Sequence, residues 1–402
     1  MKKILIVWEL GGGYGHISTF LELANTLKKR GFDVSFALKD LDYNGRLLVK
    51  RGFRCVKAPV WNHFRGVTSD LNNYTEMLTR FGYLDSKRLL PVVKAWRDLF
   101  NQLSPDLIIA NHSPTALFAS AGLDLKKAIY GTGFECPPRL RPFPKLDPRS
   151  QVTESSLLAT DAQVLESINQ ISDELAMPAR QQVSDILEAD AEFLCTFAEL
   201  DPYLDYRNAP EYWGLQVDTR LSKISKWKSM IGKDAVFAYL RPNYTRLTET
   251  LAALKQLDHK VVVHCPRLPA DFKSDYETGK LSFVDEPLQI KDIVSKFRMI
   301  VSHAGHGTSL ALLLEGCPHF MLPMYTEQLI TARRVTDLGA GRYLEKNDDT
   351  QAISDELINA LDDKSLRLSA REFSRRYPGF SQSEQTGNLS RRIIALMNQD
   401  ET

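Results

Sequence analysis

The segment from Met299 to Gln328 constrains the fold of this chain more than any other. It reads as an apolar strand, a glycine turn, a helix that stops at Gly316, a second apolar strand and a loop that leads into another helix. Strands that are joined through helices pair in parallel, because the chain must cross over before the next strand begins. The segment therefore predicts an α/β unit, in which ligands bind beyond the carboxyl ends of the strands.

The start of the chain repeats this order of elements. Residues 3–7 are aliphatic and β-branched, and residues 11–15 include four glycines. A helical apolar period follows from Phe20 to Leu27. Further apolar strands are predicted in two series, at residues 34–38, 107–110 and 192–196 and at residues 235–240, 260–264, 281–284, 298–302 and 318–322. At 402 residues the chain is long enough for two domains, so we predict an α/β fold with two such units.

The segments that follow each series predict the domain limits. Residues 206–232 lack a clear apolar period and predict a linker. Ser381 and Glu384 have the spacing of a capping box and predict the start of a last helix. We expect three segments: a first domain over residues 1–216, a second domain over residues 217–380 and a C-terminal helix over residues 381–402.

The composition argues against several classes of protein. Lys and Arg together number 51 and Asp and Glu 50, so the net charge of +1 does not favour nucleic acid as a partner. The apolar run at residues 4–7 is far shorter than the roughly 20 residues of a membrane helix. The five cysteines form no C-x-x-C pair, which argues against a zinc site or a disulfide framework and favours a cytoplasmic location.

The glycine turn at residues 303–309 has the composition of a diphosphate site. The N-terminus of the helix that follows presents free N–H groups and the positive end of the helix dipole. Gly305 and Gly307 let the backbone approach phosphate oxygens. Hydroxyl and ring N–H donors are expected from Thr308, Ser309 and His303. We therefore expect these five residues to bind a nucleoside diphosphate.

This segment also resembles the donor-binding signature of the UDP-glycosyltransferase superfamily, in which H-x-G-x-x-[ST] precedes G-x-P and P-x-x-x-[DE]-Q. The residues that fall in register are His303, Gly305, Thr308, Gly316, Pro318, Pro323, Glu327 and Gln328. The stretch from Gly13 to His16 resembles the opening of the same family. The resemblance implies a GT-B fold, with two Rossmann-like domains facing across a cleft and a C-terminal helix that returns to the first domain.

The resemblance further implies an inverting transfer of a hexose-type sugar from a nucleoside diphosphate to a hydroxyl group of a small-molecule or lipid acceptor, without a metal or other cofactor. Glu327 and Gln328 would hold hydroxyls of the donor sugar, or they complement the helix dipole. Ala311 and Asp285 depart from the residues that contact ribose and uracil in many members, so dTDP stays open although UDP is favoured. Arg241 either reaches a phosphate or is a surface residue.

His16 is the candidate general base, because deprotonating a hydroxyl near neutral pH needs a group with a pKa of about 6.5. The alternative is an ordinary residue in the first turn of a helix. The family usually has a carboxylate that orients this histidine, and Asn111 stands at the matching position. An amide can orient the ring, but it has no charge that would stabilise an imidazolium. We expect Asn111 to act with His16, and Gly15 to lie beside the donor.

The acceptor site is expected in the first domain. Residues 136–150 contain five prolines and predict an ordered loop or lid, followed by helices at residues 157–175 and 179–187. The aromatic residues of this domain permit a flat or lipid-like acceptor. The basic residues of the loop permit an anionic acceptor, a peripheral membrane contact or a solvated surface; they are Arg139, Arg141 and Lys145. The sequence leaves the oligomeric state open.

Four other functions compete with this interpretation. The glycine motif at residues 13–18 with Asp40 after the next strand is typical of a dinucleotide enzyme, although its third position is not Gly or Ala. Asp40 and Asp42 match the D-x-D of metal-dependent transferases. A nucleotide-sugar epimerase would share the GT-B fold. A non-catalytic nucleotide-sugar-binding protein would explain Asn111 and Ala311.

Overall fold

The computed structural model describes residues 1–12, 15–61, 71–217, 234–285, 294, 297–344 and 350–398. The chain divides into two compact units. Unit 1 comprises Met1–Val217 and Ser381–Thr402, and unit 2 comprises Asp218–Phe380. The first break therefore lies one residue after the expected limit of the first domain. Residues 218–233 of the expected linker lie outside the described residues.

Unit 1 is built on a six-stranded parallel sheet in the order β3-β2-β1-β4-β5-β6. Its strands are β1 (Lys3–Trp8), β2 (Asp33–Leu38), β3 (Arg54–Lys57), β4 (Leu107–Asn111), β5 (Lys126–Gly131) and β6 (Ala191–Leu194). Its helices are α1 (Gly15–Ser18), α2 (Leu21–Lys29), α3 (Arg46–Val49), α4 (Tyr74–Thr79), α5 (Ser86–Leu103), α6 (Pro114–Ala119), α7 (Glu154–Glu174) and α15 (Gln382–Met397).

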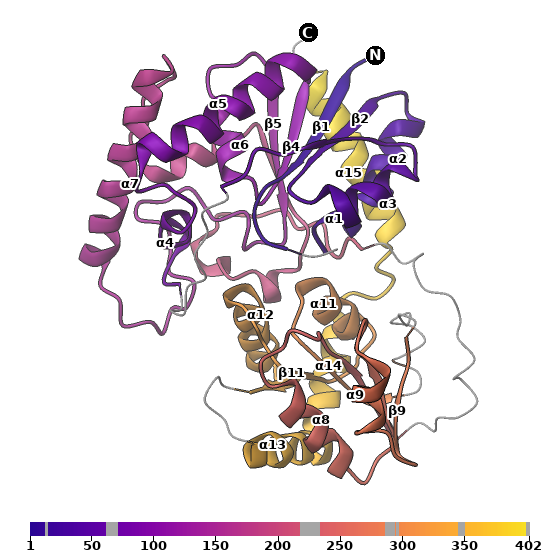
Figure 1. The fold of residues 1–402 in the computed structure, drawn as a ribbon. Coiled ribbons are helices and arrows are strands. Elements are labelled where there is room, and N and C mark those ends of the chain that lie inside the picture. Colours follow the sequence, from indigo (N-terminus) through magenta and orange to yellow (C-terminus); the bar gives the residue numbers. More distant parts are fainter. Residues whose placement is uncertain are drawn as a thin grey trace. The chain divides into compact units, whose positions relative to one another are not determined.

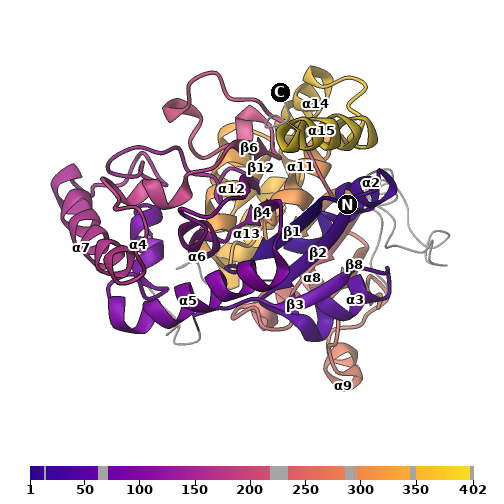
Figure 2. The same ribbon diagram turned by 90° about the horizontal axis from the view of Figure 1, so that it is seen from above.

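Both faces of this sheet are buried, as expected for parallel strands. Successive side chains of β1 point to opposite faces. Ile4, Ile6 and Trp8 pack in one core with residues of α2 and α15, whereas Leu5 and Val7 pack in the other core with residues of α5, α6 and α7. Figure 1 shows the yellow helix α15 beside α2, and Figure 2 shows α4, α5, α6 and α7 grouped away from this pair. The last helix of the chain thus completes the core of unit 1.

Unit 2 repeats the topology with a sheet in the order β12-β11-β10-β7-β8-β9. Its strands are β7 (Ala235–Tyr239), β8 (Val261–His264), β9 (Leu281–Phe283), β10 (Phe297–Ser302), β11 (His319–Met321) and β12 (Gly341–Tyr343). Its helices are α8 (Leu247–Gln256), α9 (Ala270–Ser274), α11 (His306–Leu314), α12 (Thr326–Asp337), α13 (Thr350–Asp362) and α14 (Lys364–Arg376). In each unit the first strand of the series lies beside the fourth, which is where α/β sheets bind ligands.

The nine predicted strands and the last helix are present. Ser381 accepts a hydrogen bond from the backbone N–H of Glu384, as its capping-box spacing predicts. Residues 136–150 contain neither helix nor strand. The helix predicted at residues 179–187 is wrong in length, because only Val183–Leu187 form a 3₁₀ helix. Three strands were not predicted, namely β3, β5 and β12, because they have three to six residues and too little alternation to be distinguished from loops.

Candidate active site

The carboxyl edge of unit 1 brings His16 and Asn111 together. His16 follows β1, and Asn111 is the last residue of the neighbouring strand β4. The two residues are 95 positions apart in the sequence, and His16 Nδ1 lies 2.7 Å from Asn111 Oδ1. Asn111 Nδ2 donates to the carbonyl of Tyr130 at 2.8 Å, which turns the amide oxygen toward the ring. Nδ1 of His16 is therefore the donor, and Nε2 is the nitrogen that can accept a proton.

The ring of His16 is confined by its neighbours. It stacks on Trp8 with a centroid distance of 5.3 Å and lies 6.2 Å from the ring of His112. Gly11 has a φ of +74°, and a Cβ there would come within 2.4 Å of His16 Nε2. Only glycine combines this backbone conformation with room for the ring. Gly11 therefore allows the turn after β1 and also leaves room for the ring of His16.

Burial is the main cause that lowers the pKa of His16 below its ordinary value of 6.5. The charge of Glu135 and the hydrogen bond to Asn111 raise this pKa, and Lys39 lowers it further. The net direction leaves the imidazole neutral at pH 7, which is the form that a general base requires.

Two buried carboxyl groups at this edge were missed by sequence reasoning. Glu135 follows β5 and is 4% exposed. Glu9 follows β1, accepts from the backbone N–H of Thr115 at 2.9 Å, and burial raises its pKa to about 7. Neither residue belongs to a motif. Glu9 follows the same strand as His16, and the order of strands in the sheet places Glu135 at this edge. A signal existed in their position just after a strand, where functional side chains of α/β proteins gather.

The carboxyl edge of unit 2 forms a glycine turn and a helix N-terminus. Ala304 has a φ of +54°, Gly305 is the N-cap residue, and the nine-residue helix α11 begins at His306. Gly305, Gly307 and Thr308 are half-buried and line the first turn of this helix. This geometry suits an anion, because the first N–H groups of a helix lack intrahelical partners.

His303 does not have the free ring N–H that the sequence predicts. Its Nδ1 donates to the carbonyl of Leu322 at 2.8 Å, and its Nε2 accepts from the backbone N–H of Arg241 at 2.9 Å. Burial lowers the pKa of His303 to about 4, so the ring is neutral. The prediction that it donates to a phosphate is wrong for this arrangement, because both nitrogens join loops of unit 2 to one another. Arg241 is half-buried beside it.

Ser309 also differs from the prediction. Its side chain is fully buried, and its hydroxyl lies 3.4 Å from Nδ1 of His319. Nε2 of His319 in turn lies 2.8 Å from the hydroxyl of Ser302. On a helix, residues one position apart point in different directions, so Thr308 stays at the surface while Ser309 faces the sheet. Ser309 is a core residue here and not a phosphate ligand.

The residues predicted to hold the sugar lie in the first turn of α12. Glu327 is half-buried, and Gln328 is 7% exposed. Gln328 Oε1 accepts from the backbone N–H of Met324 at 2.8 Å, so this oxygen stabilises the loop before the helix. The structure therefore places both residues in the first turn of α12, and Gln328 also stabilises the loop before it.

The D-x-D match has a structural role. Asp40 accepts hydrogen bonds from the backbone N–H groups of Asp42 and Tyr43 at 3.0 and 3.3 Å, and so caps the helical turn Leu41–Gly45. Among the described residues, no group of three or more His, Cys, Asp and Glu could hold a metal ion. Within the same part of the chain, no helix combines the length and the apolar character that a membrane crossing requires.

Comparison with known proteins finds local similarity in sequence and similarity in fold over nearly the whole chain. Residues 248–377 match the model of the erythromycin biosynthesis protein CIII-like C-terminal domain. A stretch of 71 residues is 35% identical to NDP-glycosyltransferase YjiC of Bacillus licheniformis, and it spans 18% of this chain and 18% of that relative. Sequence similarity to this relative is thus local.

Solved structures match over nearly the whole chain. The glycosyltransferase VinC, solved in complex with dTDP, has a TM-score of 0.69 at 14% identity, and the match covers 99% of this chain and 100% of VinC. The spinosyn rhamnosyltransferase SpnG, solved with spinosyn aglycone, has a TM-score of 0.67 at 13% identity, with coverage of 99% and 100%. The fold is therefore that of GT-B glycosyltransferases. The resemblance to the UDP-glycosyltransferase superfamily is confirmed.

Proposed function

We propose that the protein transfers a hexose-type sugar from a nucleoside diphosphate to a hydroxyl group of a small-molecule or lipid acceptor. The observation that carries this proposal is the 2.7 Å contact between His16 and Asn111. It orients the ring through Nδ1 and leaves Nε2 to receive the proton of the acceptor hydroxyl. The GT-B fold and the glycosyltransferase relatives support the same assignment.

The reaction is a single displacement. The acceptor O–H bond breaks as its proton moves to His16 Nε2, and the oxygen forms a new bond to the anomeric carbon of the sugar. The bond from that carbon to the diphosphate breaks, and its electron pair leaves with the phosphate oxygen. Attack from the face opposite the leaving group inverts the anomeric configuration.

Unit 2 is proposed to stabilise the leaving diphosphate without a metal ion. The N-terminus of α11, with Gly305, Gly307 and Thr308 in its first turn, supplies N–H groups and the positive end of a helix dipole. Arg241 can add a positive charge next to this turn. Glu327 and Gln328 are proposed to contact hydroxyls of the donor sugar, with the amide nitrogen of Gln328 as the donor.

UDP is proposed as the nucleotide in preference to dTDP. VinC was solved with dTDP, so the thymidine nucleotide is the first alternative to test. The acceptor is proposed to bind in unit 1, because the candidate base His16 lies there; SpnG, which has the same fold, was solved with an aglycone. A cytoplasmic location is proposed because all five cysteines are free thiols.

A direct assay tests this function. The full chain is incubated in chelator with UDP-glucose or dTDP-glucose and a panel of hydroxylated aromatic and lipid acceptors, and products are identified by mass spectrometry and by the NMR coupling of the anomeric proton. We expect a glycoside of inverted configuration. An altered sugar nucleotide without any glycoside would identify an epimerase. Tight nucleotide binding without turnover across the panel would support a binding protein.

A further inference from the structure

Glu135 lies at the same edge of the unit 1 sheet as His16 and Asn111. The strands β1, β4 and β5 are consecutive neighbours. His16 follows β1, Asn111 and His112 lie at the carboxyl end of β4, and Glu135 follows β5. Asn111 joins two of these strands through its bond to the carbonyl of Tyr130. The three loops therefore meet beyond one edge, although their residues lie far apart in the sequence.

The carboxylate of Glu135 is fixed by its own turn. Its Oε2 accepts from the backbone N–H of Thr132 at 2.8 Å and from the hydroxyl of Thr132 at 2.7 Å. A Cβ at Gly131 would lie 2.9 Å from the same oxygen, so the carboxylate sits directly over the end of β5. Both bonds are donated to the ionised form, which they stabilise.

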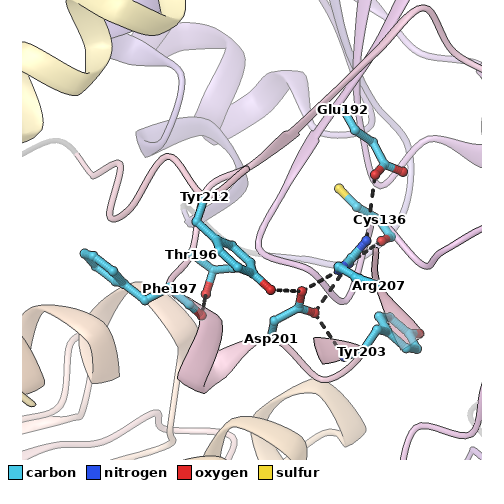
Figure 3. Close-up of polar contacts among 8 residues, drawn as sticks. All are labelled: Cys136, Glu192, Thr196, Phe197, Asp201, Tyr203, Arg207 and Tyr212. Carbon is cyan, nitrogen blue, oxygen red and sulfur yellow. Dashed lines mark hydrogen bonds and ion pairs between the residues drawn. The ribbon is translucent and has the colours of Figure 1, made fainter. Parts of the chain in front are cut away.

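A buried ion pair contacts the chain at Cys136, the residue after Glu135 (Figure 3). Arg207 pairs with Asp201, and its Nη2 donates to the carbonyl of Cys136 at 2.7 Å. The side chains of Arg207 and Asp201 are 3% and 0% exposed, and Tyr212 donates its hydroxyl to Asp201 at 2.9 Å. The backbone next to Glu135 is thus held in place, because the buried pair of Arg207 and Asp201 binds the carbonyl of Cys136.

The charges around the two groups favour an ionised Glu135. Burial raises its pKa, but His16, His112 and the bonds from Thr132 lower it, and the net direction is downward. His16 in turn is affected by Glu135 and Lys39, and His112 is neutral because burial lowers its pKa to about 3. The thiols of Cys136 and Cys195 and the hydroxyl of Tyr203 also lie near Glu135, and burial keeps all three protonated at pH 7.

We propose that Glu135 is a positioning residue for His16, whose buried carboxylate supplies the negative charge that Asn111 lacks. It stabilises the imidazolium that forms when His16 takes a proton. This role rests on the proposed function in one respect, namely that the proton taken up by His16 comes from an acceptor hydroxyl. The family position that usually carries the carboxylate would then be filled by an amide that orients the ring, while the charge comes from the segment after the neighbouring strand β5.

The test is an NMR titration of the His16 ring in four proteins: wild type, Glu135→Gln, Glu135→Asp and Asp161→Asn. We expect Glu135→Gln to lower the pKa of His16 and Glu135→Asp to leave it near the wild-type value. Asp161→Asn is the matched control, since it neutralises a buried carboxylate of unit 1 that accepts from Thr75 instead. An unchanged His16 titration in folded Glu135→Gln overturns the proposal.

The kinetic arm measures kcat and KM across pH. Glu135→Gln should lower kcat on the order of 10²-fold, the size expected for a nearby unit charge at an effective dielectric constant of about 20, and change KM for the donor within about twofold. The acid limb should move to lower pH, and Asn111→Asp in the same protein should restore both. A wild type that transfers no sugar while its His16 titration depends on Glu135 overturns the proposed function and leaves the charge coupling supported.

The reciprocal measurement applies if Glu135→Gln does not fold. The carboxyl carbon of Glu135 is titrated by ¹³C NMR in wild type and in His16→Gln. We expect the pKa of Glu135 to rise when His16 is lost, because the protonated ring is the largest of the charges that lower it. A Glu135 titration that is identical in both proteins overturns the proposal.

Discussion

The two sheets have the same strand order, yet the histidines at their carboxyl edges differ in what their nitrogens do. His16 of unit 1 uses one nitrogen to contact a side chain and lies near a carboxylate. His303 of unit 2 uses both nitrogens in bonds with the backbone. The first histidine can take up a proton, whereas the second joins two loops and stays neutral. We therefore propose that one topology serves proton transfer at one edge and anion binding at the other.

The largest effect that would test this difference comes from His16→Ala. We expect sugar transfer to fall by roughly 10² to 10⁴, the usual contribution of a positioned base, while donor affinity changes by no more than about twofold. Steady-state kinetics and donor titration calorimetry measure the two quantities. Transfer at the wild-type rate with donor binding intact would assign the proton to another group.

The proposed anion site of unit 2 predicts that a nucleoside diphosphate alone stabilises the folded protein. UDP or dTDP at 100 times its dissociation constant, in chelator, should add about 2.7 kcal/mol to the free energy of unfolding. Urea unfolding followed by circular dichroism measures this change. Stabilisation that appears only with magnesium or manganese would mean that the N-terminus of α11 does not act without a metal ion.

Two neighbouring residues of α11 are expected to differ in their effect on ligand binding. Thr308→Val should weaken binding of the diphosphate by about 1.5 to 3 kcal/mol and leave nucleoside binding unchanged, because its hydroxyl is expected to contact phosphate. Ser309→Ala is the matched control: it should lower stability and leave affinity for the diphosphate within about twofold, since Ser309 is buried against His319. Calorimetry with UDP and with uridine distinguishes the two. Equal losses for both ligands would indicate damage to the fold.

The smallest expected effect is a shift in the pH profile. A general base must be unprotonated, so the rate falls as the pH decreases through the pKa of His16. Burial places this pKa below 6.5, and the acid limb of kcat should therefore lie below pH 6.5. Asn111→Asp adds a negative charge in direct contact with the ring and should move the limb to higher pH. A limb that does not move would show that His16 does not control the profile.

The sequence alone determined the class of fold and the places where ligands are expected. Strands and helices are local patterns with periods of 2 and 3.6 residues, so the spacing of apolar residues is enough to predict them. Glycines between them mark the turns. The same spacing placed His16 and Thr308 at the starts of helices. Short strands such as β12, and the length of the 3₁₀ helix, depend on contacts outside the segment and were not predictable in this way.

The contacts of each side chain in the site depend on how the strands are arranged in space. Arg241 and His303 are 62 residues apart, and His16 and Asn111 are 95 apart, so their hydrogen bonds follow from the order of strands in the sheets. Glu135 belongs to no motif, and it comes near His16 because β5 lies beside β4. A sequence pattern records which residue follows a strand, whereas the pKa of that residue depends on burial and on charges that other strands bring to it.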